Sequence, residues 1–299
     1  MNRQISYTIS NNEDGLTVKQ FLISKGYSHP VLVQLKKTPR SILLNDEWLY
    51  FHSRLSCGDI LTINIEETES SPNIVSTYFP LDIIYEDDDI IVINKSANMP
   101  IHPSMNNYDN SLANALMYYY RNENSPFVYR CINRLDKDTS GLTVIAKNPL
   151  SAAILYREMN QRNIHRTYYA LVEGNPPSHG TINEKISRMP GSTIMRCVDN
   201  INGETAVTHF KTLKSNGNIS LVECRLETGR THQIRVHMTH IGHPLLGDYL
   251  YNPTNHMLSH HALHGGILEF LHPITQEKLC FHAPFEKEFA QCLKDIEIV

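Results

Sequence analysis

The 299-residue sequence has little of what marks several classes of protein. Its six cysteines are scattered and form no Cys-x-x-Cys pair, which disfavours a disulfide framework and indicates a reducing compartment. No apolar run approaches the ~18 residues that a membrane-spanning helix needs. The first residues show no signal-peptide pattern. We therefore expect a cytoplasmic protein that has no membrane partner.

Positive charge is also scarce, with 27 Lys and Arg against 31 Asp and Glu and a net charge of −4. This balance argues against a polycationic nucleic-acid coat and leaves room for a local basic groove. Residues 184–235 carry eight basic and five acidic residues, a net charge of +3. We expect the groove there, formed by Lys185, Arg188, Arg196, Lys211, Lys214, Arg225, Arg230 and Arg235.

Residues 1–67 are predicted to form a small α+β domain. Val18, Phe21 and Leu22 recur at helical spacing after Thr17, and a second short helix is expected over 31–37. Strands are predicted within 42–48 and over 60–65. This order resembles the S4 RNA-binding fold. Residues 1–70 have a net charge of −1, so a packing role and an RNA-binding role both stay open.

A polar linker is predicted over 68–79, followed by a second domain over 80–299. This domain should open with a hairpin whose acidic turn, residues 86–89, is solvated, because it lacks the ligand spacing of a calcium loop. Helices are expected after Ser111 and from Pro149. Further strands are expected over 162–174, 206–213, 219–226, 268–270 and 278–281, with helices over 234–241 and from about 285.

The most unusual stretch is 132–147, where charged residues precede a buried strand predicted over 142–146. Arg134 and Asp136 would point to the same side of an extended backbone. Residues 139–141 predict a tight turn, with Gly141 free to take a positive φ. A carboxylate held beside an arginine on a rigid turn suits catalysis. An ion pair that caps the strand is the structural alternative.

Four segments, taken in order, resemble the RluA-type pseudouridine synthases. They are the hairpin 84–95, the signature Asn133-Arg-Leu-Asp-Lys-Asp-Thr-Ser-Gly-Leu142, the tyrosine strand 166–174 and the arginine motif 226–237. The segment 242–248 and residues 262–264 also fit. The resemblance implies an α+β fold with a mixed, largely antiparallel central sheet and flanking helices. Asn133 stands where the family often has histidine, so it retains polar capping but cannot titrate.

The resemblance also implies a reaction and a set of residue roles. The enzyme would isomerise uridine to pseudouridine in RNA without a cofactor. Asp136 would be the nucleophile or base, Tyr168 would stack on the uracil, and Arg235 would pair with Asp136. Arg134 would fill the space left by the flipped uridine. The other residues expected to bind substrate are Thr139, Arg166, Arg230, His232 and Gln233. We expect a monomer that acts on ribosomal RNA, with transfer RNA as the alternative target.

Three other functions compete with this one. His260 and His264 have the i,i+4 spacing of zinc ligands, although no HExxH pattern is present, so no metal site is expected. A glycoside hydrolase would need two facing carboxylates, and Asp138 is the only candidate near Asp136. A catalytically inactive RNA-binding protein would keep the fold without the intact set of Asp136, Tyr168 and Arg235.

Overall fold

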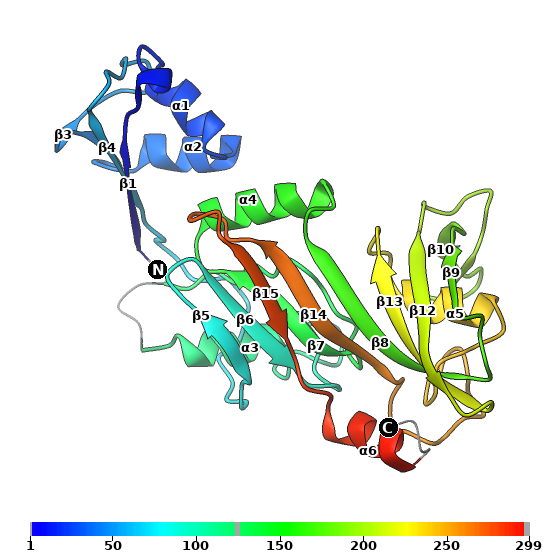
Figure 1. Cartoon of the computed structure of the whole chain (residues 1–299). Helices are drawn as coiled ribbons and strands as arrows, with labels where there is room; N and C mark the ends of the chain where they lie inside the picture. Colours follow the sequence, from blue (N-terminus) through cyan, green and yellow to red (C-terminus); the bar gives the residue numbers. More distant parts are fainter. Residues whose placement is uncertain (1, 123–125, 296–299) are drawn as a thin grey trace.

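The computed structural model describes residues 2–122 and 126–295, which form two parts with separate sheets (Figure 1). The N-terminal part contains β1 (Arg3–Thr8), η1 (Asn11–Glu13), α1 (Val18–Ser24), α2 (His29–Lys37), β2 (Ile42–Leu44), β3 (Glu47–Trp48) and β4 (Ile60–Ile65). The larger part contains β5 (Ile83–Glu86), β6 (Ile90–Lys95), α3 (Leu112–Tyr119), β7 (Ser140–Ala146), α4 (Pro149–Asn160), β8 (His165–Glu173), β9 (His179–Ile182), β10 (Ile186–Arg188), β11 (Arg196–Val198), β12 (Thr208–Ser215), β13 (Ile219–Leu226), α5 (Gln233–His240), β14 (Leu263–Leu271), β15 (Lys278–His282) and α6 (Lys287–Asp295).

The N-terminal part has two helices packed on a four-stranded sheet of order β1-β4-β2-β3. Thr17 and Gln20 form a reciprocal cap at the start of α1, and this pairing explains why the helix begins where the sequence predicts. The predicted helices and strands are confirmed. Strand β1, which was not predicted, pairs along its whole length with β4 in antiparallel register. The six residues of β1 are mostly polar, so the sequence alone does not indicate a strand. The strand forms because β4 provides its hydrogen-bond partners.

The larger part is built on a nine-stranded sheet in which β5-β6-β7-β14-β8-β13-β12-β9 lie in order and β15 pairs with β14. Within it, only β7 and β14 are paired in parallel. The predicted mixed, largely antiparallel sheet with flanking helices is confirmed. Every residue of β7 is buried, as its continuous apolar run predicts. This strand is the rigid element that follows Asp136.

The acidic turn after β5 joins the two parts, which corrects the prediction of a solvated turn. Asp89 is only 3% exposed, and its carboxylate accepts hydrogen bonds from Arg3 Nε and Nη2 at 3.0 and 2.8 Å. It also accepts from Asn148 Nδ2 and Ser151 Oγ at the start of α4. The carboxylate is buried because four donors from distant segments replace its water shell.

The predicted linker runs along the larger part and is held there by hydrogen bonds. The backbone N–H of Ser71 donates to the Phe127 carbonyl at 3.1 Å, and Asn114 Nδ2 donates to the Val75 carbonyl at 2.8 Å. Ile74 and Phe79 pack against the buried core. Together with Leu150 and Ile154 of α4, which belong to the same buried cluster as Phe21 and Leu22, these contacts fix the two parts to each other. None of the helices in the described residues is long and apolar enough to cross a membrane.

Candidate active site

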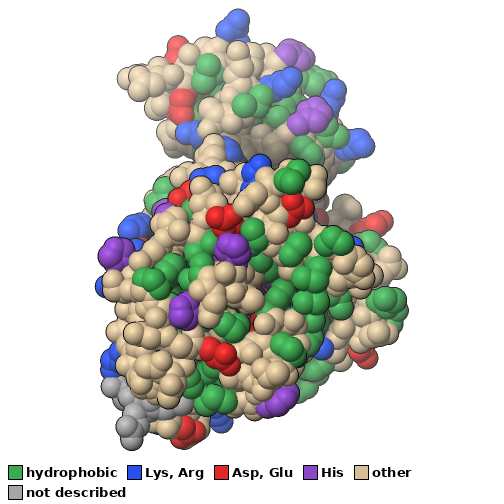
Figure 2. Space-filling view, turned by 90° about the vertical axis from the view of Figure 1, so that its right-hand side faces the viewer, with side chains coloured by type: hydrophobic (Ala, Val, Ile, Leu, Met, Phe, Trp, Pro, Cys, Tyr) green, Lys and Arg blue, Asp and Glu red, His purple; other side chains and the backbone are tan. Residues whose placement is uncertain are grey.

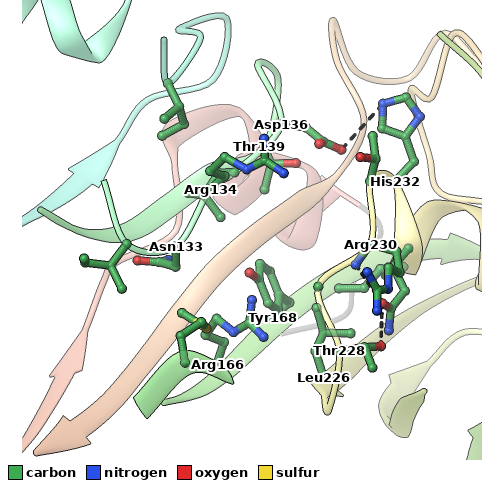
Figure 3. Close-up of a pocket in the computed structure, with 18 of the residues that line it drawn as sticks. Asn133, Arg134, Asp136, Thr139, Arg166, Tyr168, Leu226, Thr228, Arg230 and His232 are labelled. Carbon is green, nitrogen blue, oxygen red and sulfur yellow. Dashed lines mark hydrogen bonds and ion pairs between the residues drawn. The ribbon is translucent and has the colours of Figure 1, made fainter. Parts of the chain in front are cut away.

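All nine residues predicted for the site line one cavity of about 820 Å³. Its walls come from the segment before β7, the end of α4, β8, the loop 226–232 and the start of α5 (Figure 3). The structure therefore brings together three of the four motifs, the signature, the tyrosine strand and the arginine motif, which lie up to about a hundred residues apart. The lining residues that the motifs did not single out include Tyr156, Met159 and Arg162.

The Asp136 turn is held by its own backbone and by a histidine behind it. The backbone N–H of Thr139 donates to the Asp136 carbonyl at 3.2 Å, and the Thr139 hydroxyl is 2.8 Å from His261 Nε2. The turn thus spans 136–139, whereas the sequence placed it over 139–141. Thr139 is buried and positions the turn, so its side chain does not present a free group to substrate.

Gly141 has the predicted positive φ (114°), but it lies within β7. A Cβ there would lie 2.3 Å from the Gly265 carbonyl oxygen of β14. Gly265 in turn is the register partner of Tyr168 on β8, and a Cβ on it would sit 3.4 Å from the tyrosine ring. Gly141 therefore allows β7 and β14 to meet closely, whereas a Cβ at Gly265 would make only an ordinary contact with the buried Tyr168 ring.

Arg235 contacts two carboxylates. Its guanidinium forms a bidentate pair with Asp248, with Nε–Oδ2 and Nη2–Oδ1 distances of 2.7 and 2.8 Å. Its Nη1 is 3.5 Å from Asp136 Oδ2, so the predicted pairing with Asp136 is present but is the longer one. The Arg235 and Asp248 side chains are 3% and 0% exposed. The Tyr251 ring lies 5.0 Å from the guanidinium and adds a cation–π contact. Sequence reasoning missed both Asp248 and Tyr251 as partners.

His232 approaches Asp136 from the start of α5. Its backbone is left-handed, with φ of 58°, a conformation uncommon outside glycine. Its Nδ1 is 2.8 Å from the Tyr251 hydroxyl, and its Nε2 is 3.9 Å from Asp136 Oδ2. Burial lowers the pKa of the imidazole, and the nearby Asp136 carboxylate opposes this change. The ring is therefore largely neutral at pH 7.

The side-chain amide of Gln233 holds the loop before α5 in place through hydrogen bonds to other protein groups. Its Oε1 accepts from the Thr228 hydroxyl at 2.8 Å and from the Arg230 N–H at 3.0 Å. Its Nε2 donates to the Val207 carbonyl and the Thr208 hydroxyl. All four hydrogen-bonding positions of the amide are used, so in this structure Gln233 positions the loop, and its expected contact with substrate stays a prediction.

Three of the five arginines that line the cavity come from outside the predicted groove. Of the eight cations between 184 and 235, only Arg230 and Arg235 line the cavity, and both pair with carboxylates. The other six cations of the predicted groove do not line this cavity. Arg134, Arg162 and Arg166 line the cavity from the segment before β7 and from around the start of β8. The Nε of Arg166 is buried without a hydrogen-bond partner among the described residues.

The Asn133 side chain caps backbone groups of β7, as its retained polar character allows. Its Nδ2 donates to the Leu142 carbonyl at 3.0 Å and its Oδ1 accepts from the Val144 N–H at 2.9 Å. Both bonds join the segment before Asp136 to β7. This side chain therefore supports the site through backbone contacts and needs no titration for that task.

The side chains that could together bind a metal ion lie away from the cavity. Among residues 2–122 and 126–295, one group has ligand atoms close enough to hold an ion, namely Asp87, Asp89 and His272. Its members already bond to protein groups, since Arg3 donates to Asp89 and His272 Nε2 lies 2.9 Å from Asp87 Oδ2. His260 and His264 do not lie on one helix, so their i,i+4 spacing does not place them on one helix face as zinc ligands.

Lys95 is a buried group that the motifs did not identify as part of the site. It is 1% exposed, and its Nζ donates to the carbonyls of Ser96 and Lys137 at 2.8 and 3.0 Å. The second bond ties the end of β6 to the residue after Asp136. Burial lowers the pKa of Lys95 to about 7, and the carboxylates of Asp138 and Glu286 limit the decrease.

This lowered pKa predicts a pH-dependent contribution to stability. Because the folded-state pKa is about 7 and the ordinary value is 10.5, the unfolded chain binds more protons between these pH values. The contribution of Lys95 to stability therefore becomes more favourable as pH rises through this window. We expect the free energy of unfolding of wild type minus that of Lys95→Met to rise by up to about 1.4 kcal/mol per pH unit.

Urea unfolding at several pH values between 7 and 9 measures this difference. Lys137→Met is the matched control, because Lys137 is exposed and its removal should give no such trend. A difference between wild type and Lys95→Met that stays constant with pH would contradict the prediction.

Comparison with known proteins agrees with this fold. The family model for RNA pseudouridylate synthase matches residues 89–240. The Bacillus subtilis protein YjbO, named as an uncharacterized RNA pseudouridine synthase, is 36% identical over 280 residues, which cover 93% of this chain and 99% of YjbO. Ribosomal large subunit pseudouridine synthase D is 40% identical in Zymomonas mobilis, with 73% of this chain and 74% of that protein covered.

The same synthase from Escherichia coli is 33% identical over 307 residues, covering 97% of this chain and 94% of that one. The solved structure of human RNA Pseudouridylate Synthase Domain Containing 1 matches with a TM-score of 0.58 and 25% identity, over 74% of this chain and 96% of that one. The chain therefore belongs to the RNA pseudouridine synthase family, in its RluA-type branch. It is an isomerase by family.

Proposed function

We propose that this enzyme converts specific uridines of ribosomal RNA to pseudouridine and that Asp136 carries the reaction. The observation that supports this most strongly is the Asp136 carboxylate, 3.5 Å from the buried Arg235 guanidinium, in a cavity that also contains Tyr168. The guanidinium holds the carboxylate in place at the cavity, and a carboxylate is a group that can act as a nucleophile or a base.

The reaction balances within the nucleotide. The bond between N1 of uracil and C1′ of ribose breaks, the base rotates, and C5 forms a new bond to C1′. The hydrogen on C5 leaves as a proton, and N1 gains one. The Asp136 carboxylate would attack C1′, attack the base, or remove the C2′ proton. The reaction involves no net redox change, so it needs no electron carrier.

The cavity arrangement suits a base that has left its stack. A uridine inside a helix cannot reach Asp136, so it must flip out. Tyr168 offers an aromatic face beside Asp136, and Arg134, which is exposed at the cavity, would occupy the space that the base leaves. Arg166 and Arg230 would contact phosphates, because guanidinium groups suit phosphate oxygens.

Ribosomal RNA is proposed as the target because the named relatives that share 33–40% identity with this chain include several ribosomal large subunit synthases. We propose in addition that residues 1–67 form an S4-like domain, on the strength of two helices packed on a small sheet. The six cysteines are free, which supports the proposal of a reducing, cytoplasmic setting.

Tritium release tests the function. Large-subunit ribosomal RNA and transfer RNA, transcribed in vitro with uridine tritiated at C5, are incubated separately with the purified protein. Each isomerisation frees one C5 hydrogen, so we expect tritium release from the ribosomal transcript in a fixed molar ratio. Release from transfer RNA alone would contradict the proposed target, and release from neither would contradict the function.

A further inference from the structure

The N-terminal part contains a second hollow, of about 600 Å³, that none of the site motifs reaches. It lies between α1, α2 and the segment that follows β3. None of its thirteen lining residues is acidic, and they include Lys19, Lys36, His29 and His52. Figure 2 shows Lys, Arg and His side chains on this part of the molecule, which is the upper lobe in that view.

A ladder of exposed aromatic rings lies at this hollow. Trp48 and Tyr50 are 55% and 58% exposed. Their ring centroids are 5.0 Å apart, and Tyr50 stacks on His52 at 5.5 Å with an interplanar angle of 12°. Exposed large aromatics of this kind cost hydrophobic free energy unless a ligand covers them.

Exposure alternates along the segment that follows β3. Leu49 and Phe51 pack towards the domain core, whereas Trp48, Tyr50 and His52 are exposed. The chain turns here, with the Ser53 N–H donating to the Tyr50 carbonyl at 3.0 Å. The segment is held in place, because the N–H groups of Val18 and Lys19 donate to the carbonyls of Ser53 and Phe51 at 3.0 and 3.1 Å. The rings are therefore presented on a rigid backbone.

The N-terminal part has a negative net charge, which by itself would disfavour binding to RNA, but its charges are unevenly distributed. Residues 1–70 have a net charge of −1, yet the hollow is lined by cations alone among its charged residues. The acids lie elsewhere, with Glu13 paired to Lys25 and Glu67 paired to Arg130. The local charge at the hollow, rather than the net charge of the domain, is what a polyanion meets.

We propose that this hollow binds an unpaired segment of the RNA substrate, with bases stacked on Trp48, Tyr50 and His52 and phosphates beside Lys19 and Lys36. Aromatic faces stack on any base, and flanking cations neutralise the backbone. An acidic peptide would suit the lysines but would gain little from the stacked rings. This inference rests on the proposed function, because it assumes an RNA substrate.

Helix α4 connects the hollow's domain to the cavity. Its Leu150 and Ile154 belong to the buried cluster of the N-terminal part, and its Tyr156 and Met159 line the cavity. The two RNA sites are therefore held in a fixed relation by one helix. A grip at the hollow would restrict which uridines of a folded RNA can reach Asp136.

Trp48 is the only tryptophan of the chain, so its fluorescence reports on the hollow directly. A single-stranded polyuridine should quench this fluorescence, and rising salt should reverse the quenching. A fully paired duplex and the polyanion heparin should quench it far less, because neither offers free base faces. Equal quenching by heparin would overturn the stacking part of the proposal, and concentration-dependent quenching without RNA would indicate a second copy of the chain instead.

Variants give the second readout, measured as binding of labelled single-stranded RNA. Trp48→Ala should weaken binding on the order of tenfold, whereas Trp48→Phe, which keeps a stacking ring, should weaken it much less. Tyr108→Ala is the aromatic control, since Tyr108 is exposed outside the hollow. Lys36→Ala should weaken binding more than Lys37→Ala, because only Lys36 of these two exposed neighbours lines the hollow. Equal effects within each pair would overturn the inference.

Tritium release by the same wild-type preparation separates the two proposals. If tritium is released while Trp48 fluorescence does not respond to single-stranded RNA, the hollow is not an RNA site and the proposed function stands. If the fluorescence responds and no tritium is released from either RNA, the function is wrong and the binding site stands.

Discussion

Replacing Asp136 with asparagine is expected to reduce pseudouridine formation to the detection limit while RNA binding stays close to that of wild type. An amide has nearly the same shape as a carboxylate, but it is neither a nucleophile nor a base at neutral pH. The fold should survive, because Arg235 keeps its bidentate pair with Asp248. The cavity arginines Arg134 and Arg166 remain available to bind RNA.

Asp138→Asn is the matched control, because Asp138 lies in the same turn and does not line the cavity. Tritium release and filter binding are measured on both variants with the same transcript. We expect activity to persist in Asp138→Asn, which would also exclude a mechanism based on two carboxylates. If Asp138→Asn lost activity while Asp136→Asn kept it, the reactive carboxylate would be Asp138 and the role proposed for Asp136 would be wrong.

Replacing Asp248 with leucine is expected to cause the largest loss of stability of any single change near the site. It would leave the Arg235 guanidinium buried, with only the longer contact to Asp136. Removing one partner of a buried ion pair costs about 3–5 kcal/mol, because the remaining charge is desolvated. The melting temperature should fall by roughly 2–4 °C for each kcal/mol.

Thermal and urea unfolding measure this loss of stability. A surface variant serves as the control, and a double variant tests whether the unpaired buried charge causes the loss. Glu269→Gln removes a partly exposed carboxylate 3.7 Å from the exposed Lys278, and a surface pair of this kind contributes at most about 1 kcal/mol. Adding Arg235→Met to Asp248→Leu should restore much of the stability, since the buried charge is then gone. A loss no greater than that of Glu269→Gln would show that Asp248 does not hold Arg235.

The sequence was most informative where local rules or an ordered motif decide the outcome. The cap residues Thr17, Ser111 and Asn148 begin their helices as predicted. The predicted site residues meet at one cavity because they belong to motifs that are recognisable as a set. Asp136 and Arg235 illustrate this success, since they are 99 residues apart and in contact.

The sequence was least informative about buried polar pairs. Nothing in the local pattern links Arg3 to Asp89 or Lys95 to the Lys137 carbonyl, because tertiary packing decides which charge is desolvated beside which partner. Net charge says equally little about where cations gather. Of the cations expected to form a groove over 184–235, only Arg230 and Arg235 line the cavity. The cationic hollow at Trp48 lies in a domain of negative net charge.

The central claim is that the Asp136 carboxylate converts uridines of ribosomal RNA to pseudouridine. Carbodiimide mapping of pseudouridine in ribosomal RNA from a strain that lacks the gene tests it most directly, with complementation by wild type or by Asp136→Asn. We predict that specific sites are lost in the deletion strain, return with wild type and stay absent with Asp136→Asn. Restoration of those sites by Asp136→Asn would contradict the account.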